Sequence, residues 1–287
     1  MRAVILGAGG RLGQALCAAL PTADPLTRAD FDLAAPTRLD WSAYDTVINA
    51  AAYTKVDQAE QDRAAVWAAN ATGPANLARI ALEHDLRLVH ISTDCVFDGT
   101  HPGPIPETCP MAPLSAYGAA KAAGDTAVAL VPNHWIIRPS WVIGAGASFA
   151  RTMLGLAERG IAPIVVADQV GRPTLAGDLA AGIVALLDAA PGTYHLTNPG
   201  DALSWADLAR FVLEQAGHDP GMVTAVTSAE YYADKPGSAT RPPNSVLDLT
   251  KATEAGVALP DWRESLAAHL ATPFTTPPIS PPRGPGR

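Results

Sequence analysis

Two side chains that can exchange protons stand four residues apart in the alanine-rich stretch LSAYGAAKAAG, residues 114–124. If this stretch is helical, Tyr117 and Lys121 share one face and lie about 5.4 Å apart along the axis. A nearby ammonium favours a phenolate, so we expect Lys121 to lower the pKa of Tyr117 from its ordinary value of about 10. A phenol tuned in this way can exchange a proton with a carbonyl oxygen. The same spacing also occurs by chance on surface helices, so other segments have to support it.

A hydroxyl group that suits the same chemistry lies upstream, in LVHISTDCVFDG, residues 88–99. The apolar run predicts a buried strand that ends near Thr93. Ligands bind at the carboxyl ends of strands in open α/β sheets, so we expect Thr93 to hydrogen-bond the carbonyl oxygen that receives the proton. A threonine in this place is often only a cap or a turn residue. Its occurrence between a glycine-rich turn and Tyr117 favours the catalytic interpretation.

The glycine-rich turn opens the chain, in VILGAGGRLGQAL, residues 4–16, where Gly7, Gly10 and Gly13 follow an apolar run and begin a helix. Small residues let the backbone approach a pyrophosphate, and the helix N-terminus offers free N–H groups and a positive dipole end. A tight strand-to-helix turn without a ligand is the alternative. The spacing G-x-x-G-x-x-G resembles that of short-chain dehydrogenase/reductase folds. We therefore predict a dinucleotide site here.

The segment PLTRADFDL, residues 25–33, bears on which dinucleotide binds. A carboxylate near the end of the second strand suits the ribose of NAD, whereas an arginine suits a 2′-phosphate. Arg28 lies at about this position, and Asp30 and Asp32 follow it. We expect NADPH, with NADH as the alternative, while Arg28 could equally be a solvated loop charge.

These groups together describe the reduction of a ketone. A nicotinamide supplies hydride to the carbonyl carbon, Tyr117 supplies a proton to the oxygen, and Thr93 polarises the bond.

The elements that must position these groups alternate along the first half of the chain. Val- and Ile-rich runs predict buried strands, and alanine- and leucine-rich stretches predict helices between them, the pattern of a Rossmann-type doubly wound parallel sheet. The predicted strands are residues 2–8, 45–51, 86–93 and 134–140, and the predicted helices are residues 13–20, 64–84 and 115–130.

Beyond residue 142 the pattern is less regular. We expect helices at 148–160, 175–190 and 204–217, the last with Ser204 as N-cap, a strand that runs into a loop over 161–174, and a short strand over 192–198. The domain prediction is a dinucleotide-binding domain at 1–141, to which 168–198 returns, and a smaller C-terminal substrate-binding region at 142–271. The proline-rich tail, 272–287, is predicted to be disordered.

Composition limits the partners. The formal net charge of -8 disfavours nucleic acid and acidic membrane surfaces, so a phosphate-bearing ligand must be held locally. Three widely spaced cysteines form neither a disulfide framework nor a zinc site, which favours a cytoplasmic protein. We expect no membrane span. An alanine-rich helix face would allow a homodimer but would serve equally well as core.

Segments spread along nearly the whole chain resemble the dTDP-4-dehydrorhamnose reductases, extended-type short-chain reductases that complete dTDP-L-rhamnose synthesis. The segments are VINAAAYTKVDQAE (47–60), NATGPANLA (70–78), ISTDCVFDG (91–99), YGAAK (117–121), RPSWVIG (138–144), DQVGRPT (168–174), YHL (194–196), RPPNSVLD (241–248) and PDWRESL (260–266).

This resemblance implies roles for individual residues of this chain. Thr93, Tyr117 and Lys121 take the catalytic roles given above, and Lys121 also anchors the cofactor ribose. Further implied cofactor contacts are Gly10, Arg11 and Leu12 at the phosphates, Asp32 and Leu33 by the adenine, and Ala52, Tyr53 and Thr54 at the border of the cofactor. The implied substrate contacts are Thr54, Val56, Thr93, Asp94, Cys95 and Trp141, the indole of Trp141 covering the C–H face of the sugar; a core position is the alternative for this tryptophan.

One residue departs from the family pattern, which usually reads STDYVFDG. Cys95 stands where the tyrosine would be, so the accepted 4-keto sugar could differ. Reduction of dTDP-4-dehydro-β-L-rhamnose is the leading prediction, and reduction of a related dTDP-sugar ketone, as in dihydrostreptose formation, is the second. A non-catalytic NADP-binding subunit, like the β subunit of methionine adenosyltransferase, is the third, but a binding role needs no proton donor. Some family members are described with Mg²⁺; no carboxylate cluster here can be assigned to it, and we predict no metal ligand.

Overall fold

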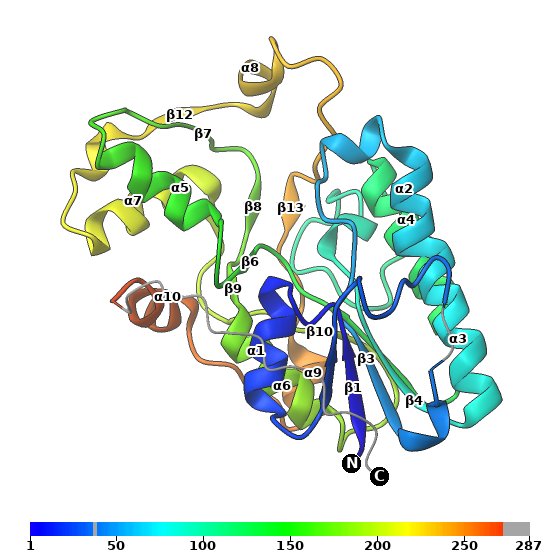
Figure 1. The fold of residues 1–287 in the computed structure, drawn as a ribbon. Coiled ribbons are helices and arrows are strands. Elements are labelled where there is room, and N and C mark those ends of the chain that lie inside the picture. Colours follow the sequence, from blue (N-terminus) through cyan, green and yellow to red (C-terminus); the bar gives the residue numbers. More distant parts are fainter. Residues whose placement is uncertain (37–38, 272–287) are drawn as a thin grey trace.

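A six-stranded parallel sheet forms the centre of the molecule in the computed structural model, which describes residues 1–36 and 39–271 (Figure 1). Its spatial order is β10 (Gly192–His195), β5 (His134–Arg138), β4 (Arg87–Ile91), β3 (Thr46–Asn49), β1 (Ala3–Leu6) and β2 (Asp24–Leu26). The chain leaves β1 toward β2 on one side and returns to β3 on the other. This reversal of direction creates the crevice at which doubly wound sheets bind ligands, and it confirms the predicted fold class.

Alternate residues of the strands pack against helices on opposite faces of the sheet, because a parallel sheet is buried on both sides. Ile5, Ile48, Val89 and Ile137 belong to one core cluster, together with apolar residues of α1 (Arg11–Ala19), α6 (Ala176–Leu186) and α9 (Thr250–Glu254). Val4, Val47, Leu88 and Ile136 belong to the other, with residues of α3 (Gly73–His84) and α4 (Ala116–Val128). Figure 1 shows these two groups of helices on opposite sides of the strands.

The helix predicted over 64–84 is interrupted. α2 (Arg63–Trp67) passes into a π-helical turn, η3 (Ala68–Thr72), before α3 begins at Gly73. The turn brings Asn70 into the interior, and a Cβ added to Gly124 of α4 would lie 2.3 Å from the Asn70 carbonyl oxygen. The interruption coincides with this close packing of α4, and the alanine-rich sequence alone does not reveal it.

A smaller lobe is assembled after residue 142 from short pieces. Its helices are α5 (Phe149–Ala157), α7 (Trp205–Gln215), α8 (Ser228–Tyr232) and α10 (Trp262–Ala271). Its strands are β6 (Val142–Ile143) paired with β9 (Thr174–Leu175), β7 (Ile164–Val166) paired with β12 (Thr224–Val226), and β8 (Val170–Gly171) paired with β11 (Leu203–Ser204) and β13 (Asn244–Ser245). Short 3-10 turns complete the described chain: η1 (Trp41–Ala43), η2 (Gln58–Glu60), η4 (Asp94–Val96) and η5 (Pro220–Met222).

Predictions for this lobe were partly wrong. The segment 161–174, expected to be one strand that runs into a loop, contains three short strands: β7 pairs with β12, β8 with β11 and β13, and β9 with β6. The capping prediction is confirmed, since the Ser204 hydroxyl accepts a hydrogen bond from Asp207 N in a capping box.

The chain returns from this lobe to the central sheet, where α6 packs against α1 and β10 pairs in parallel with β5. The division at residue 142 stays a prediction, and the predicted tail, 272–287, lies outside the described residues. Within 1–36 and 39–271, no helix has both the length and the apolar character needed to cross a membrane.

Candidate active site

A cleft of about 1240 Å³ opens at the carboxyl ends of the central strands. One wall consists of the glycine-rich turn, the loop after β3, the end of β4 and the first turns of α4, and the smaller lobe supplies the other. Of the predicted site residues, all line the cleft except Gly13. The predicted residues thus lie together at one cleft, and their individual roles stay predictions.

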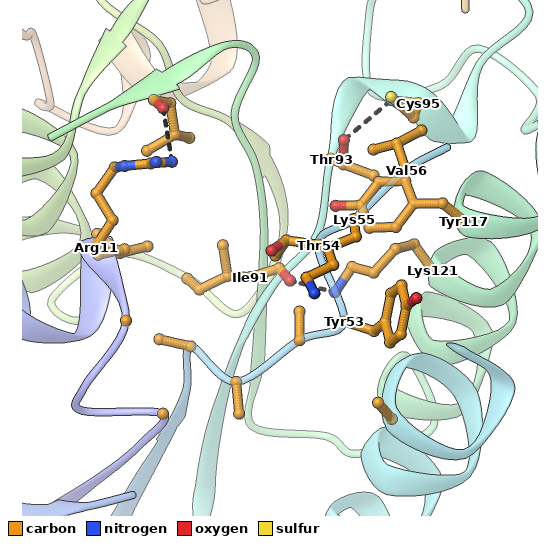
Figure 2. A pocket seen from close by; sticks show the side chains of 18 of the residues that line it. Arg11, Tyr53, Thr54, Lys55, Val56, Ile91, Thr93, Cys95, Tyr117 and Lys121 are labelled. Atoms are coloured by element: carbon orange, nitrogen blue, oxygen red, sulfur yellow. Dashed lines mark hydrogen bonds between the residues drawn. The ribbon is translucent and has the colours of Figure 1, made fainter. Parts of the chain in front are cut away.

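Tyr117 and Lys121 lie on the face of α4 that points into the cleft (Figure 2). Ser115 caps this helix by accepting a hydrogen bond from Gly118 N at 3.1 Å. A Cβ on Gly118 would lie 2.2 Å from the Cys95 carbonyl oxygen, so glycine is needed for the turn η4 to pack against the helix. This close approach holds Thr93, at the N-cap of η4, beside Tyr117.

The expected effect of Lys121 on Tyr117 is wrong. Burial raises the pKa of Tyr117, and Cys95, Asp94 and Asp125 add to the rise, while only the hydrogen bond with Thr93 lowers it. The phenol is therefore neutral at physiological pH. A neutral phenol still carries the proton that a carbonyl oxygen would receive, so the group suits a proton donor.

Lys121 is fully buried, with 1% of its surface exposed. Its Nζ donates to the Ile91 carbonyl oxygen at 2.5 Å and lies 3.2 Å from His90 Nε2. Burial lowers the pKa of Lys121 to about 8, and Asp125 opposes this shift. The Lys121 ammonium is thus shielded from bulk solvent and lies at the floor of the cleft.

A buried polar cluster lies beneath Lys121. Burial and the charge of Lys121 lower the pKa of His90 well below its ordinary value, so its imidazole is neutral. Asp125 Oδ2 accepts from Arg138 Nε at 3.0 Å, and its Oδ1 lies 3.8 Å from His90 Nε2. Asn49 completes the cluster, 3.0 Å from His90 Nδ1. Sequence reasoning missed these four residues. For Asn49, His90 and Arg138 the signal was a polar residue inside an otherwise apolar strand, whereas Asp125 lies on α4.

Thr93, Asp94 and Cys95 follow β4 at the base of the cleft. The Thr93 hydroxyl donates to Asp94 Oδ1 at 3.0 Å and accepts from Cys95 N at 3.2 Å. Burial raises the pKa of Asp94 and of the Cys95 thiol, while a hydrogen bond from Ser245 lowers that of Asp94. Cys95 is consequently a neutral thiol in the wall that also carries Tyr117.

The glycine-rich turn forms the opposite end of this wall. Gly7 has φ +80°, and a Cβ there would lie 2.6 Å from the Ala51 backbone. The N-cap of α1, Gly10, has no side-chain cap, so the N–H groups of the first turn are open to an anion. Gly13 is different: a Cβ there would lie 2.1 Å from the Gly7 carbonyl oxygen. Its role is close packing of α1 on the turn, not contact with a ligand.

Arg11 stands at the start of α1 and, in Figure 2, on the side of the pocket away from Tyr117. Its guanidinium donates to the carbonyl oxygens of Val142, at 3.2 Å, and of Ala147. Gly144 makes room for it, because a Cβ there would lie 2.6 Å from Arg11 Cγ. The buried Nε–H has no hydrogen-bond partner in the described part of the chain. An unpaired donor beside the open helix end suits a phosphate group.

Arg28 follows β2 and is exposed, with 88% of its side chain accessible. Its guanidinium lies 3.7 Å from Asp32 Oδ2, while Asp30 accepts from the amide and hydroxyl of Thr27. Arg28 therefore lines the cleft just after β2, whereas Asp30 and Asp32 lie further from the end of that strand.

The loop after β3 carries the predicted residues Ala52, Tyr53, Thr54 and Val56. Asn70 fixes the loop through two hydrogen bonds, accepting from Tyr53 N at 2.8 Å and donating to Tyr53 O at 3.0 Å. The π-helical turn thus has a function in the wall, since it points this amide inward.

Trp141 begins the wall supplied by the smaller lobe, with a positive φ of +46°. Its ring stacks on Trp205 at 3.8 Å between centroids, and Gly171 leaves space for it. Because both rings line the cleft, Trp141 is not simply a core residue. Trp205, Gln169 and Arg241 also line it and were missed; Gln169 and Arg241 lay within family-like segments without an assigned role.

No three His, Cys, Asp or Glu side chains in residues 1–36 and 39–271 are grouped as they would be around a metal ion.

The comparisons with known proteins agree with this geometry. The family model "RmlD substrate binding domain" matches residues 1–273. A dTDP-4-dehydrorhamnose reductase of Aggregatibacter actinomycetemcomitans is 37% identical, with 92% of this chain and 97% of that protein covered. A probable dTDP-4,6-dihydroxy-2-methyloxan-3-one 4-ketoreductase of Streptomyces antibioticus is 40% identical, with 93% of each chain covered.

A solved structure is also similar. The dTDP-4-dehydrorhamnose reductase of Bacillus anthracis, in complex with NADP, superposes with a TM-score of 0.84 at 33% identity, covering 93% of this chain and 98% of that one. The family match over nearly the whole length, together with these relatives, places the protein: the chain belongs to the dTDP-4-dehydrorhamnose reductase family, which carries the RmlD substrate binding domain.

Proposed function

We propose that this protein is an NADPH-dependent reductase that converts the 4-keto group of dTDP-4-dehydro-β-L-rhamnose to the alcohol of dTDP-L-rhamnose. The observation that carries the proposal is the convergence of Tyr117, Thr93 and Lys121 at the carboxyl end of β4, in the same cleft as the glycine-rich turn. Relatives named as dTDP-4-dehydrorhamnose reductases support the substrate class.

The residues present fit a dinucleotide. The open first turn of α1, the backbone space at Gly7 and the unpaired Nε–H of Arg11 would hold its phosphates. We propose that Arg28 favours the 2′-phosphate of NADPH, with NADH as the weaker alternative; the NADP complex of the B. anthracis relative supports this preference. When bound, the nicotinamide supplies a hydride to the carbonyl carbon.

The chain's own groups handle the proton. Tyr117, neutral because it is buried, donates its hydroxyl proton to the developing alkoxide, while the Thr93 hydroxyl hydrogen-bonds the same oxygen. Lys121 lies on the same face of α4, with its Nζ held by the Ile91 carbonyl oxygen and His90, and we propose that it anchors the ribose of the cofactor. A homodimer, a cytoplasmic location and the absence of a metal ligand stay predictions.

A second candidate is the reduction of a related dTDP-sugar ketone. Cys95 replaces the usual tyrosine of the family motif and lines the cleft, and the S. antibioticus relative is named for a different dTDP-keto sugar. A smaller side chain at this position changes the shape of the wall that faces the sugar.

The test is NADPH oxidation by the purified protein with dTDP-4-dehydrorhamnose made in situ, beside other dTDP-4-keto sugars and with NADH in parallel. We expect turnover with the rhamnose precursor and a higher kcat/KM with NADPH. Turnover with a different keto sugar alone would select the second candidate. NADPH binding without turnover of any of them would exclude a reductase.

A further inference from the structure

One ion pair links the two walls of the cleft. Arg241, which follows α8 in the smaller lobe, donates to Asp57 from both terminal nitrogens, at 2.6 Å to Oδ1 and 2.8 Å to Oδ2. Asp57 belongs to the loop after β3. Nη1 also donates to the Ala239 carbonyl oxygen at 2.7 Å. Three of the five N–H donors of the guanidinium are therefore hydrogen-bonded, which fixes its position.

The two remaining donors of Arg241 form a fork. They are Nε–H and the second N–H of Nη2, which lie side by side on one edge of the planar group. In residues 1–36 and 39–271 no acceptor is bound to either of them. Tyr232 flanks the group, with its ring centroid 5.5 Å from Cζ. A fixed, parallel pair of donors of this kind matches two oxygens of a phosphate.

The position of Arg241 in the cleft favours the substrate over the cofactor. It lines the cleft with Pro242 and Ser245, and its charge lowers the pKa of Cys95 against the effect of burial. Arg11 and Arg28, in contrast, adjoin the glycine-rich turn and β2. Lys121 is committed to Ile91 and His90 at the floor.

Five cations of the described chain line the cleft: Arg11, Arg28, Lys55, Lys121 and Arg241. Since Arg11 and Arg28 lie at the cofactor end and Lys121 is held at the floor, Lys55 and Arg241 are the two left for the substrate. The diphosphate of a nucleotide sugar is negatively charged, and a chain of net charge -8 must neutralise that charge with local cations.

We infer that Arg241 binds the diphosphate of the nucleotide sugar through its Nε and Nη2 edge, and that Asp57 is the positioning residue that aims this edge. Asp57 offsets part of the positive charge, so directed hydrogen bonds carry the affinity. The inference rests on the proposed function for the identity of the ligand, a nucleoside diphosphate sugar, but not for the step of hydride transfer.

The test is calorimetric binding of dTDP, and separately of NADPH, to the full chain and to Arg241→Gln. We expect the Kd of dTDP to rise about 10- to 100-fold, because hydrogen bonds to charged groups are lost, and the Kd of NADPH to stay within about twofold. Arg210→Gln is the matched control, since Arg210 pairs with Asp207 on α7 at 2.8 Å and does not line the cleft. It should leave both constants unchanged.

Two further variants keep the inference open to refutation if Arg241→Gln folds poorly. Arg241→Lys keeps the charge without the fork, and it should weaken dTDP about 5- to 30-fold. Asp57→Asn should weaken dTDP by a smaller factor. An unchanged Kd for dTDP in Arg241→Lys would overturn the inference, and so would an equal loss for dTDP and NADPH, which would make the ion pair only a latch between the lobes.

The two proposals fail separately. Loss of dTDP binding in Arg241→Gln, in a protein that reduces none of the dTDP-keto sugars, would support the diphosphate site and contradict the reductase. Normal dTDP binding in Arg241→Gln, in a protein that does reduce them, would do the reverse.

Discussion

The two walls of the cleft are built in different ways. The sheet wall places Tyr117 and Lys121 on the long helix α4 and Thr93 just after β4, with at most 9% of each residue exposed. The wall of the smaller lobe presents Trp141 and Arg241 on loops, and Trp205, which stacks on Trp141, at the first residue of α7. The residues that we propose for proton transfer thus lie on or next to long regular elements, and two of the three residues of the facing wall, Trp141 and Arg241, lie on loops.

The sheet wall is also the one with close backbone contacts. Gly118 and Gly124 on α4 bring the helix against the Cys95 and Asn70 carbonyl oxygens. We therefore expect changes in the sheet wall to cost more than changes in the smaller lobe, and the following experiments test that difference.

The largest effect is expected from Tyr117→Phe. The ring that packs in the wall is kept, but the proton is lost, so kcat should fall by about 10²- to 10⁴-fold. Steady-state kinetics and a fluorescence titration with NADPH measure this. Cofactor affinity should change little; an unchanged kcat would show that another group delivers the proton.

Asp125→Asn should cause the largest loss of stability. Arg138 and Lys121 would lose their buried carboxylate, and breaking a buried pair typically costs about 3–5 kcal/mol. Denaturant unfolding measures the free energy of unfolding. Arg210→Gln, which removes the partly exposed ion pair with Asp207 on α7 and leaves the capping box in place, should cost at most about 1 kcal/mol. Equal losses would contradict the proposed difference between the walls.

A pair of glycine substitutions compares the walls directly. Gly118→Ala forces a Cβ to within 2.2 Å of the Cys95 carbonyl oxygen, and the strain should cost about 1–3 kcal/mol and reduce kcat. Gly155→Ala lies in α5, where an added Cβ meets no atom of the described chain within 4 Å. It should stabilise the protein by up to about 1 kcal/mol. Thermal and denaturant unfolding would detect both changes.

The pH dependence should reflect the floor of the sheet wall. Burial lowers the pKa of Lys121 to about 8, so the ammonium is lost as pH rises through that value and kcat/KM should fall up to about tenfold per unit above it. The effect of Lys121 on folding stability has the opposite sign. Between about pH 8 and pH 10.5, the ordinary pKa of lysine, the unfolded chain binds more protons at this group than the folded chain does. Lys121 by itself therefore makes the free energy of unfolding rise with pH in this range. A flat rate profile from pH 7 to 9.5 would mean that the charge of Lys121 is not needed.

The smallest effect is expected from Cys95→Tyr, which restores the residue usual in the family motif. The larger side chain reaches into the substrate end of the cleft, so the ratio of kcat/KM values for two dTDP-4-keto sugars should change about 2- to 10-fold. Parallel kinetics with both sugars would measure it. If neither KM nor the ratio responds, the position is only structural.

Local patterns in the sequence were sufficient to predict the central sheet, the glycine-rich turn and the helix that carries Tyr117. The alternation of apolar runs predicted the parallel sheet, the glycine spacing predicted the turn, and the four-residue interval predicted that Tyr117 and Lys121 share a helix face. Each of these depends on residues that are close together in the chain, where period and sterics leave few choices.

Properties that arise between distant segments were decided only by the tertiary structure. Burial, set by β4, η4 and α4 together, raises the pKa of Tyr117 where the helix alone predicted a fall. The packing of α4 accompanies a π-helical turn at Asn70, and the ion pair of Asp57 with Arg241 joins residues 184 positions apart. Desolvation and long-range pairing depend on what the whole chain places around a group, and no short sequence pattern encodes that environment.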